Sequence, residues 1–447
     1  MKKYKLGDLI DIRRGASLSG EYYSSEGELM RLTLGHFDYQ NGGFKENTSK
    51  NDLFFVGPVK SEFILSEGDI ITPLTEQTPG LLGSTAMIPE SDKYIQSQDV
   101  ALITPDESKL DRNFCYYLLP SKIVKQQLAA GAQQTKIRHT TPDRIKDLTV
   151  FIPSLPEQKA IGKLLKCVDQ KIALNREINR NLEAMARQLY DYWFVQFDFP
   201  DENGKPYKSS GGKMVWNKKL KREIPEGWSD GKLIDIANIT MGQSPDGSSY
   251  NESGDGVLFY QGSTDFGLRF PSVRQYTTAP TRFAKQGDIL MSVRAPVGTT
   301  NIANADCCIG RGLSAMNSKI GSISHLYHII QDLKIAFDMR NDAGTTFGSI
   351  TKDDLYGLVV LKPDASIISK YEVLCSPVFD RQMLIGKEID VLVKQRDELM
   401  PLLMNGQVSI MPKEVNCDLE AAKECFVSSL LVVIKTLSIH VVFNKIY

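Results

Sequence analysis

The chain has 447 residues, and its 53 lysines and arginines nearly balance its 54 aspartates and glutamates. This balance excludes a protein that binds nucleic acid through its overall charge, so any such affinity has to come from local patches. An apolar fraction of 42% and a charged fraction of 24% are typical of a globular protein, and the length predicts two or three domains.

The N-terminal and cysteine patterns favour a reducing, cytoplasmic setting. The opening MKKYKLGDLIDIRRG lacks the apolar core of a signal peptide, and no apolar stretch is long enough to predict a membrane span. The seven cysteines include no C-x-x-C pair, which argues against a disulfide framework and against a thiolate metal site.

The most informative feature is an internal repeat, and the distance between the matching segments shrinks steadily along the chain. Two copies that differ by loop insertions would show this behaviour, so we predict a tandem duplication. Four segments recur in the same order: Leu9–Ile12 at Leu233–Ile236, Glu67–Ile70 at Gln286–Ile289, Ala130–Gly131 at Ala343–Gly344, and Thr141–Val150 at Thr351–Val360.

Each copy is expected to begin with short strands and turns, continue with a helical segment and close with a strand. The expected elements, in chain order, are strand-like runs at Glu62–Leu65 and Asp288–Val293, helices at Phe114–Leu128 and Ile323–Phe337, and closing strands at Leu148–Ile152 and Leu358–Leu361.

A long amphipathic helix is predicted after each closing strand. The first runs from Pro156 to about Trp193, and its apolar seam has a phase slip at Asn175. In the second, Arg396 interrupts the apolar seam and Pro401 kinks or ends the last turn. Helices of about 36 residues are roughly 50 Å long, too long to bury their seams on one small domain. We therefore expect the two helices to form an antiparallel pair. The first seam comprises Ile161, Leu165, Val168, Ile172, Ile178, Leu182, Met185 and Leu189; the second comprises Ile367, Tyr371, Leu374, Val378, Ile385, Ile389, Leu392, Leu399 and Leu403.

The predicted fold class is α+β, with two mixed α/β domains related by a pseudo-twofold axis and joined by two long helices in an antiparallel coiled coil. Residues 203–222 contain seven lysines and arginines but no acidic residue, which predicts an exposed basic linker. The expected boundaries are 1–155 for the first domain, 156–196 for the central helix, 197–226 for the linker, 227–365 for the second domain, 366–406 for the C-terminal helix and 407–447 for a tail.

Catalytic motifs are missing from the sequence. It has no P-loop, no dinucleotide-binding glycine motif and no H-E-x-x-H, and His325 with His328 lacks further ligands at metal-binding spacing. We therefore expect no catalytic residue and no metal. A nuclease that uses Asp106, Glu107 and Asp288 is kept as the least favoured alternative.

Seven segments, taken in order, resemble the specificity (S) subunit of type I restriction–modification enzymes, the HsdS family. The resemblance covers most of the chain, but the family pattern normally ends near Val408, so the tail is atypical. The segments are Ile152–Ile161, Asn181–Phe194, Gly204–Tyr207, Ile224–Trp228, Gly287–Gly298, Ile309–Leu313 and Leu399–Val408.

The resemblance implies that each domain is a target recognition domain that reads one half of a split sequence in double-stranded DNA. It also implies that the helices separate the domains and bind two methyltransferase (M) subunits, and that restriction (R) subunits join the complex. This chain would then hold no cofactor, since S-adenosylmethionine, ATP and Mg²⁺ belong to the partners. A specificity subunit of a related system, whose partner fuses methylase and nuclease, is the alternative.

The candidate DNA-binding residues are polar and cationic side chains in turns, because such side chains read base edges and hold phosphates. Arg294 and Arg311 are favoured because both follow strands in turns bounded by glycine or proline. In the first copy the candidates are Arg13, Arg14, Gln77, Gln133, Gln134, Lys136, Arg138 and His139. In the second copy they are Gln243, Ser244, Gln261, Arg269, Arg274, Arg294, Arg311 and Thr346.

Overall fold

The computed structural model describes residues 1–38, 42–47, 50–76, 80–131, 138–342 and 348–410. The chain forms two compact units. Unit 1 contains Met1–Ile172 and the segment that begins at Leu392, and unit 2 contains Ala173–Val391. Each unit therefore combines one of the expected domains with part of both long helices, whereas the sequence analysis treated the helices as separate segments.

Unit 1 contains a four-stranded sheet of order β2-β10-β6-β8, a second sheet of order β3-β5-β4-β9 and the pairs β1-β12 and β7-β11. Its elements are β1 (Lys2–Lys5), β2 (Ile10–Arg14), β3 (Tyr23–Ser24), β4 (Met30–Arg31), β5 (Phe54–Phe55), β6 (Ile70–Pro73), β7 (Thr75–Glu76), β8 (Ala86–Met87), β9 (Tyr94–Ile95), β10 (Val100–Pro105), α1 (Arg112–Leu118), α2 (Lys122–Gly131), β11 (Arg138–His139), α3 (Pro142–Lys146) and β12 (Thr149–Ile152).

Unit 2 repeats this topology with sheets of order β16-β24-β21-β22 and β17-β19-β18-β23-β20 and with the pair β15-β25. Its elements are β13 (Met214–Asn217), β14 (Arg222–Pro225), β15 (Ser229–Lys232), α5 (Leu233–Ile236), β16 (Ala237–Met241), β17 (Tyr250–Asn251), β18 (Val257–Tyr260), β19 (Tyr276–Thr277), β20 (Phe283–Ala284), β21 (Ile289–Ser292), β22 (Thr300–Ile302), β23 (Cys307–Ile309), β24 (Leu313–Ser318), α6 (Ile323–Asp342), α7 (Lys352–Gly357) and β25 (Val359–Lys362).

The matching sheet orders confirm the tandem duplication, but they correct its register near the N-terminus. The backbone N–H of Leu6 donates to the Leu148 carbonyl at 2.8 Å, and that of Leu233 donates to the Leu358 carbonyl at 2.8 Å. Leu6, and not Leu9, is therefore the counterpart of Leu233. The sequence match was misplaced by three residues because leucine and isoleucine recur at that spacing in both segments.

Of two smaller expectations, one is corrected and one is refined. The run Glu62–Leu65 is not a strand, because Ser61–Phe63 forms a short 3-10 turn that is closed by a bond from the Ile64 N–H to the Ser61 carbonyl. The basic segment 203–222 is largely exposed, as predicted, and it also contains β13, which pairs with β14 as an antiparallel hairpin.

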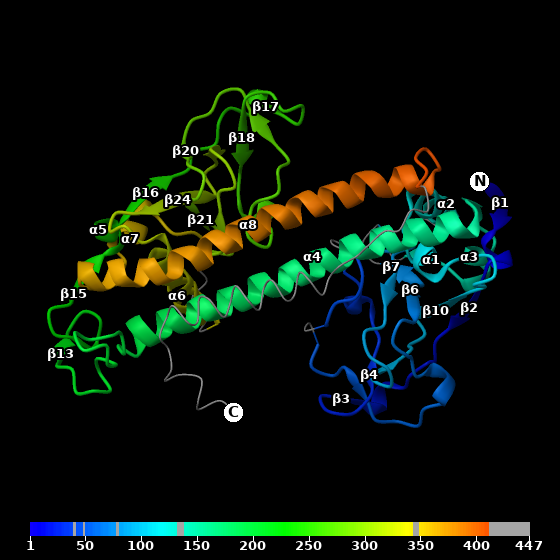
Figure 1. Ribbon diagram of the computed structural model, residues 1–447, viewed down its shortest axis with the longest axis horizontal. Helices are drawn as coiled ribbons and strands as arrows, with labels where there is room; N and C mark the ends of the chain where they lie inside the picture. Colours follow the sequence, from blue (N-terminus) through cyan, green and yellow to red (C-terminus); the bar gives the residue numbers. More distant parts are fainter. Residues whose placement is uncertain (39–41, 48–49, 77–79, 132–137, 343–347, 411–447) are drawn as a thin grey trace. The chain divides into compact units, whose positions relative to one another are not determined.

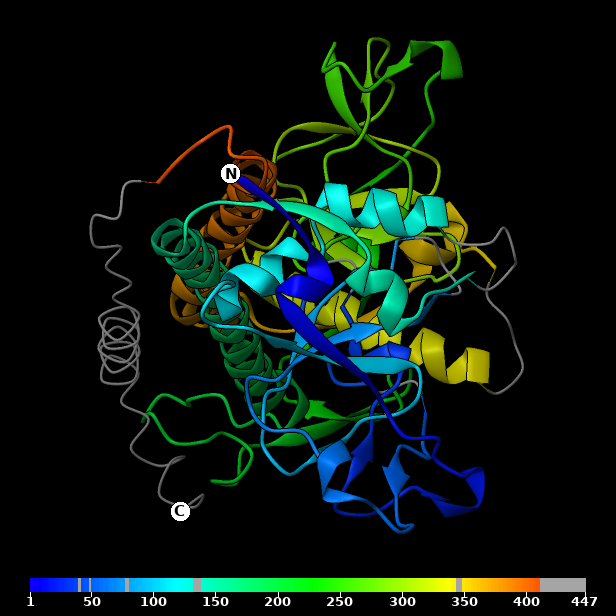
Figure 2. The same cartoon turned by 90° about the vertical axis from the view of Figure 1, so that its right-hand side faces the viewer.

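The two long helices are α4 (Leu155–Tyr190) and α8 (Ala365–Met404), and a π-helical turn at Asp191–Val195 follows α4. Figures 1 and 2 show them side by side. In unit 1, Nη1 of Arg396 lies 2.9 Å from Oδ1 of Asp169, and in unit 2 Nε2 of Gln382 donates to Oε2 of Glu183 at 2.8 Å. The contacts move forward along α4 as they move backward along α8, so the pair is antiparallel, as predicted.

The predicted seam of α4 is buried at Ile161, Leu165, Ile172, Ile178 and Leu182. Burial of each leucine or isoleucine contributes roughly 1.5–3 kcal/mol before entropy is counted. On α8, Leu399 departs from the prediction because it is exposed. The helix also continues past Pro401 to Met404, although a proline removes one backbone hydrogen bond and its ring crowds the preceding turn.

A buried polar network links unit 2's domain to both helices. Oε2 of Glu183 accepts hydrogen bonds from Arg269 and Gln382, and Oε1 accepts one from Gln331 of α6. Burial by itself would raise the pKa of Glu183, but the Arg269 charge and the two amides outweigh burial and lower it. The carboxylate is therefore held ionised among its partners.

Among the described cysteines, Cys115, Cys307, Cys308 and Cys375 are free and buried. Cys167 on α4 is disulfide-bonded, whereas the cysteine pattern argued against a disulfide framework.

The Glu183 network predicts a pH-dependent loss of stability in the Glu183→Gln variant. We expect the loss to be about 3 kcal/mol at pH 7, because the substitution leaves the Arg269 guanidinium without its counter-charge. A lowered pKa stabilises the fold above the unfolded-state value and loses that effect as pH falls. The difference from the wild type should therefore shrink below the ordinary glutamate pKa of 4.5, as measured by urea unfolding.

The control for this experiment is Glu177→Gln, which removes the same charge from an exposed position of α4. It should change stability by less than about 0.5 kcal/mol at every pH. Equal and pH-independent losses in both variants would contradict the assigned network.

Candidate nucleic-acid interface

The same backbone turn precedes one central strand in each unit. In unit 1 the turn Ser97–Val100 leads into β10, and the Val100 N–H donates to the Ser97 carbonyl at 3.0 Å. In unit 2 the turn Gly310–Leu313 leads into β24 with the same bond at 3.0 Å. We call these two turns the recognition turns.

A glycine lets a neighbouring strand end approach each recognition turn. A Cβ on Gly15 would lie 2.2 Å from the Ser97 carbonyl oxygen, and one on Gly242 would lie 2.2 Å from the Gly310 carbonyl oxygen. The Gly15 N–H donates to Val100, and the Gly242 N–H donates to Leu313. Since neither site has room for a side chain, the position of each turn depends on its glycine.

The tip of each recognition turn carries one exposed polar side chain, Gln98 in unit 1 and Arg311 in unit 2. The residue after the tip is fixed by the backbone. The Leu74 N–H donates to the Asp99 carbonyl at 2.8 Å, and the Val293 N–H donates to the Gly312 carbonyl at 2.9 Å. A rigid sheet therefore presents both tips to solvent, an arrangement that suits recognition.

Several predicted residues of unit 2 gather around Arg311. Oγ of Ser244 accepts the Arg311 N–H at 3.2 Å, and the Gln243 N–H donates to the Ile309 carbonyl at 3.0 Å. The carbonyl of Gln261 lies 2.7 Å from where a Cβ on Gly312 would be. Gln243, Gln261 and Arg311 all expose their side chains, so the structure brings these predicted residues together.

Sequence reasoning missed Arg282, which belongs to the same group. Its carbonyl accepts the Ile309 N–H at 2.9 Å, and Oγ1 of the preceding Thr281 donates to the Gln243 carbonyl at 2.5 Å. The Arg282 side chain is exposed. Its proximity comes from the pairing of β20 with β23, which no local sequence pattern indicated.

Arg294 lies next to the recognition turn of unit 2 through Val293, whose N–H binds Gly312. The Arg294 backbone forms an antiparallel bridge with Ser349, and its side chain is exposed. Its guanidinium makes no hydrogen bond or ion pair with any residue in the described ranges. Arg294 and Arg311 are thus two exposed cations on adjacent loops.

Unit 1 places Arg14 and Arg13 differently. The exposed Arg14 donates from Nε to the Gln98 carbonyl at 2.8 Å, which braces the recognition turn. Arg13 is half-buried; it donates to the Glu62 carbonyl and lies over the Phe63 ring, with its guanidinium carbon 5.6 Å from the centroid. Arg14 is the better placed of the two to meet a ligand.

Arg138 and His139 form β11 beside β7, in the position that Gly348 and Ser349 occupy beside Arg294 in unit 2. Nη1 of Arg138 lies 3.5 Å from Oε1 of the buried Glu76. The backbone N–H groups of Gly80, Leu81 and Leu82 donate to Oε2 of Glu76 at 3.0, 2.9 and 2.9 Å. Glu76 therefore orients Arg138, whose guanidinium stays partly exposed.

The structure overturns the prediction for Arg269. Its side chain is only 8% exposed, it is ion-paired with Glu183, and it lies between the rings of Tyr327 and Phe379. A guanidinium enclosed in this way is not available to DNA. It was selected because sequence alone does not show that its loop folds inward against the helices.

Arg274 is exposed but pairs through Nε with the buried carboxylate of Asp265 at 2.8 Å. The same carboxylate accepts the Gln261 N–H at 3.3 Å, so this pair shapes the loop that carries Gln261.

Five further predicted residues lie outside the described residues: Gln77, Gln133, Gln134, Lys136 and Thr346.

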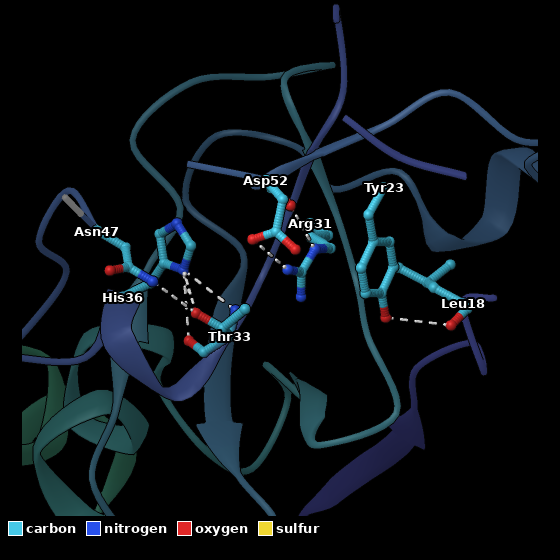
Figure 3. Close-up of polar contacts among 7 residues, drawn as sticks. All are labelled: Leu18, Tyr23, Arg31, Thr33, His36, Asn47 and Asp52. Atoms are coloured by element: carbon cyan, nitrogen blue, oxygen red, sulfur yellow. Dashed lines mark hydrogen bonds and ion pairs between the residues drawn. The ribbon is translucent and has the colours of Figure 1, made fainter. Parts of the chain in front are cut away.

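A stacked cation supports the adjoining loop of unit 1, as Figure 3 shows. The Arg31 guanidinium lies 3.8 Å from the centroid of Tyr23 and ion-pairs with Asp52 at 3.2 Å. The Tyr23 hydroxyl donates to the Leu18 carbonyl, and Tyr250 donates to Pro245 in the same way in unit 2. The loop after Gly15 thus has the same tether as the loop after Gly242.

Two buried histidines, His36 beside this loop of unit 1 and His325 on α6 of unit 2, stay neutral. Burial lowers the pKa of His36 to about 4. The Arg31 charge lowers this pKa further, whereas the hydrogen bond to Thr33 raises it. Burial lowers the pKa of His325 to about 3. Within the ranges that the structure describes, no three or more histidine, cysteine or acidic side chains are placed to hold a metal ion.

Two of the three carboxylates of the nuclease alternative serve as local structural groups. Asp106 accepts hydrogen bonds from the N–H and hydroxyl of Ser108. Asp288 accepts from the Lys285 N–H at 2.8 Å and from the Asn317 amide at 3.1 Å. These contacts explain both residues without a catalytic role.

Comparisons with known proteins identify similar chains. Residues 1–184 match the family described as "Type I restriction modification DNA specificity domain". A Methanocaldococcus jannaschii chain assigned as the MjaX type I restriction enzyme specificity subunit is 29% identical over 384 residues, which cover 82% of this chain and 83% of the relative. The MjaIX type I restriction enzyme specificity subunit of the same organism is 26% identical and covers 66% of this chain and 69% of its own length.

The fold has a counterpart among solved structures. The crystal structure of the S subunit of a type I restriction–modification system from M. genitalium aligns with a TM-score of 0.57 and 17% identity, over 90% of this chain and 96% of that one. The match places this chain in a class of two-domain proteins joined by long helices. Over most of its length the chain is therefore similar to specificity subunits of type I restriction enzymes, and residues 1–184 match a DNA specificity domain of such systems. No helix in the described part of the chain is long and apolar enough to cross a membrane.

The close approach at Gly242 predicts that Gly242→Ala disturbs the recognition turn. The added methyl group would meet the Gly310 carbonyl, so we expect a loss of about 1–3 kcal/mol in stability. Gly247→Ala is the matched control, since a Cβ there meets nothing within 4 Å. Thermal unfolding of both variants tests the assignment, and equal stability of the two would contradict it.

Proposed function

We propose that this chain is the DNA-recognition subunit of a type I restriction–modification complex, and that each unit reads one half of a split target in double-stranded DNA. The observation that carries the proposal is the repetition of the recognition turn. Two copies of the same turn, each with an exposed polar tip, suit a target with two separate half-sites.

The chemistry of the exposed side chains supports binding to DNA. Arginine and glutamine form paired hydrogen bonds with base edges in the major groove, and further cations bind phosphates. Since the formal net charge of the chain is −1, binding has to depend on such local groups. Residues proposed to contact DNA are Arg14, Arg138 and His139 in unit 1 and Gln243, Ser244, Gln261, Arg282, Arg294 and Arg311 in unit 2.

The proposal leaves the chemistry to partner subunits. The helical pair of α4 and α8 would bind two methyltransferase subunits, and restriction subunits would complete the assembly. S-adenosylmethionine, ATP and Mg²⁺ would be held by those partners, and the complex would act on DNA in the cytoplasm. Both relatives are named as specificity subunits of type I restriction enzymes, which favours this system over one with a fused methylase–nuclease partner.

Arg311→Ala and Arg294→Ala are predicted to relax specificity in one half-site. Each variant should lose about 1–3 kcal/mol of discrimination at a single base pair, because a guanidinium that pairs with a base edge is removed. The measurement is methylation by the complex reconstituted with its methyltransferase subunit, on DNA substrates that vary one base pair at a time.

Lys285→Ala is the control for these variants, because Lys285 is also exposed but is ion-paired with Asp306. It should leave the sequence preference unchanged. Uniform weakening of Arg311→Ala or Arg294→Ala on every substrate would reassign that residue to a phosphate contact.

The purified chain is expected to transfer no methyl group and cut no DNA by itself. Methylation should appear only after the methyltransferase subunit is added, and radiolabelled S-adenosylmethionine would detect it. Metal-dependent cleavage by the isolated chain that is lost in Asp106→Ala or Asp288→Ala would support the nuclease alternative.

A further inference from the structure

We propose that Gln98 is a specificity-determining residue of unit 1 and the structural counterpart of Arg311 in unit 2. The inference rests on the proposed function, and it adds a residue that the sequence did not single out. Its basis is the position of Gln98 at the tip of a turn whose backbone bonds are repeated in unit 2.

The correspondence extends beyond the turn itself. The Gln96 N–H donates to the Phe63 carbonyl at 2.9 Å, and the Ile309 N–H donates to the Arg282 carbonyl at 2.9 Å. These bonds fix the residue two positions before each tip to the equivalent neighbouring segment.

The strand next to the turn provides a second pair of matching bonds. The Thr140 N–H donates to the Leu74 carbonyl at 2.9 Å, and the Ile350 N–H donates to the Val293 carbonyl at 2.9 Å. Leu74 and Val293 are the residues whose own N–H groups hold the turn just after its tip. With both sides of the turn tied to equivalent groups, Gln98 and Arg311 occupy the same place in the two copies.

The Gln98 side chain is available to a ligand. The hydrogen bond that Arg14 donates to Gln98 goes to its backbone carbonyl, and the exposed amide makes no hydrogen bond with residues in the part of the chain that the structure describes. Gln96, two residues earlier, differs from Gln98 in burial and in hydrogen bonding. It is fully buried, and its amide donates to the carbonyls of Arg13 and Val100 at 2.7 and 2.9 Å. Gln96 therefore builds the turn, whereas Gln98 projects from it.

The two tips differ in the base that they favour. A glutamine amide pairs with N6 and N7 of adenine, whereas an arginine guanidinium pairs with O6 and N7 of guanine. An adenine is therefore expected in the half-site read by unit 1, at the place where the half-site read by unit 2 has a guanine.

The test uses the full-length chain in complex with its methyltransferase subunit and measures methylation rates on DNA with single base-pair changes. Gln98→Ala should reduce discrimination at one adenine of the first half-site roughly tenfold and leave the second half-site unchanged. Gln98→Arg should shift the preference at that base pair from adenine towards guanine, and Arg311→Gln should cause the reverse shift in the other half-site.

The control is Gln126→Ala, which removes an exposed amide from α2, away from the recognition turn. It should retain the wild-type preference at all positions. If Gln98→Ala also retains that preference while the wild-type complex recognises a split sequence, the inference about Gln98 is wrong and the proposed function stands. If the wild-type complex shows no sequence preference at all, the proposed function itself fails.

Discussion

Gly15 and Gly242 lie so close to a neighbouring carbonyl oxygen that neither position has room for a methyl group. This close approach ties the end of β2 to the turn before β10, and the end of β16 to the turn before β24. The exposed tips of the turns, the loops gathered around Arg311 and the brace from Arg14 all depend on it. The recognition surface of each unit is therefore set by backbone contacts, which leaves the tip side chain free to differ between the copies.

The long helices provide the second constraint. Two polar contacts between the helices define their antiparallel register: the ion pair of Arg396 with Asp169 and the hydrogen bond from Gln382 to Glu183. The apolar seam alone would specify this register less strictly. Arg269 extends this network into the domain of unit 2 and fixes its loop against α4, α6 and α8. An arginine that resembles a DNA contact in sequence is thus part of the link between recognition domain and helices.

Much of the fold could be predicted from the sequence, because periodic apolar residues and repeated segments are local signals. The helices after Pro156 and Pro363, the duplication and the closing strands follow from such signals. The site was harder to predict because it depends on loops brought together by strand pairing. Arg311 was found through its glycine-bounded turn, whereas Arg282 and Gln98 had no local signature, and the inward position of Arg269 follows only from tertiary packing.

The central claim is that two copies of one recognition module read two halves of a DNA target. Sequencing that detects methylated bases, in cells with and without the gene for this chain, tests it most directly. We predict that loss of the gene abolishes methylation at one motif made of two defined parts separated by undefined bases. Loss of a single uninterrupted motif, or an unchanged methylation pattern in cells that produce the protein, would contradict it.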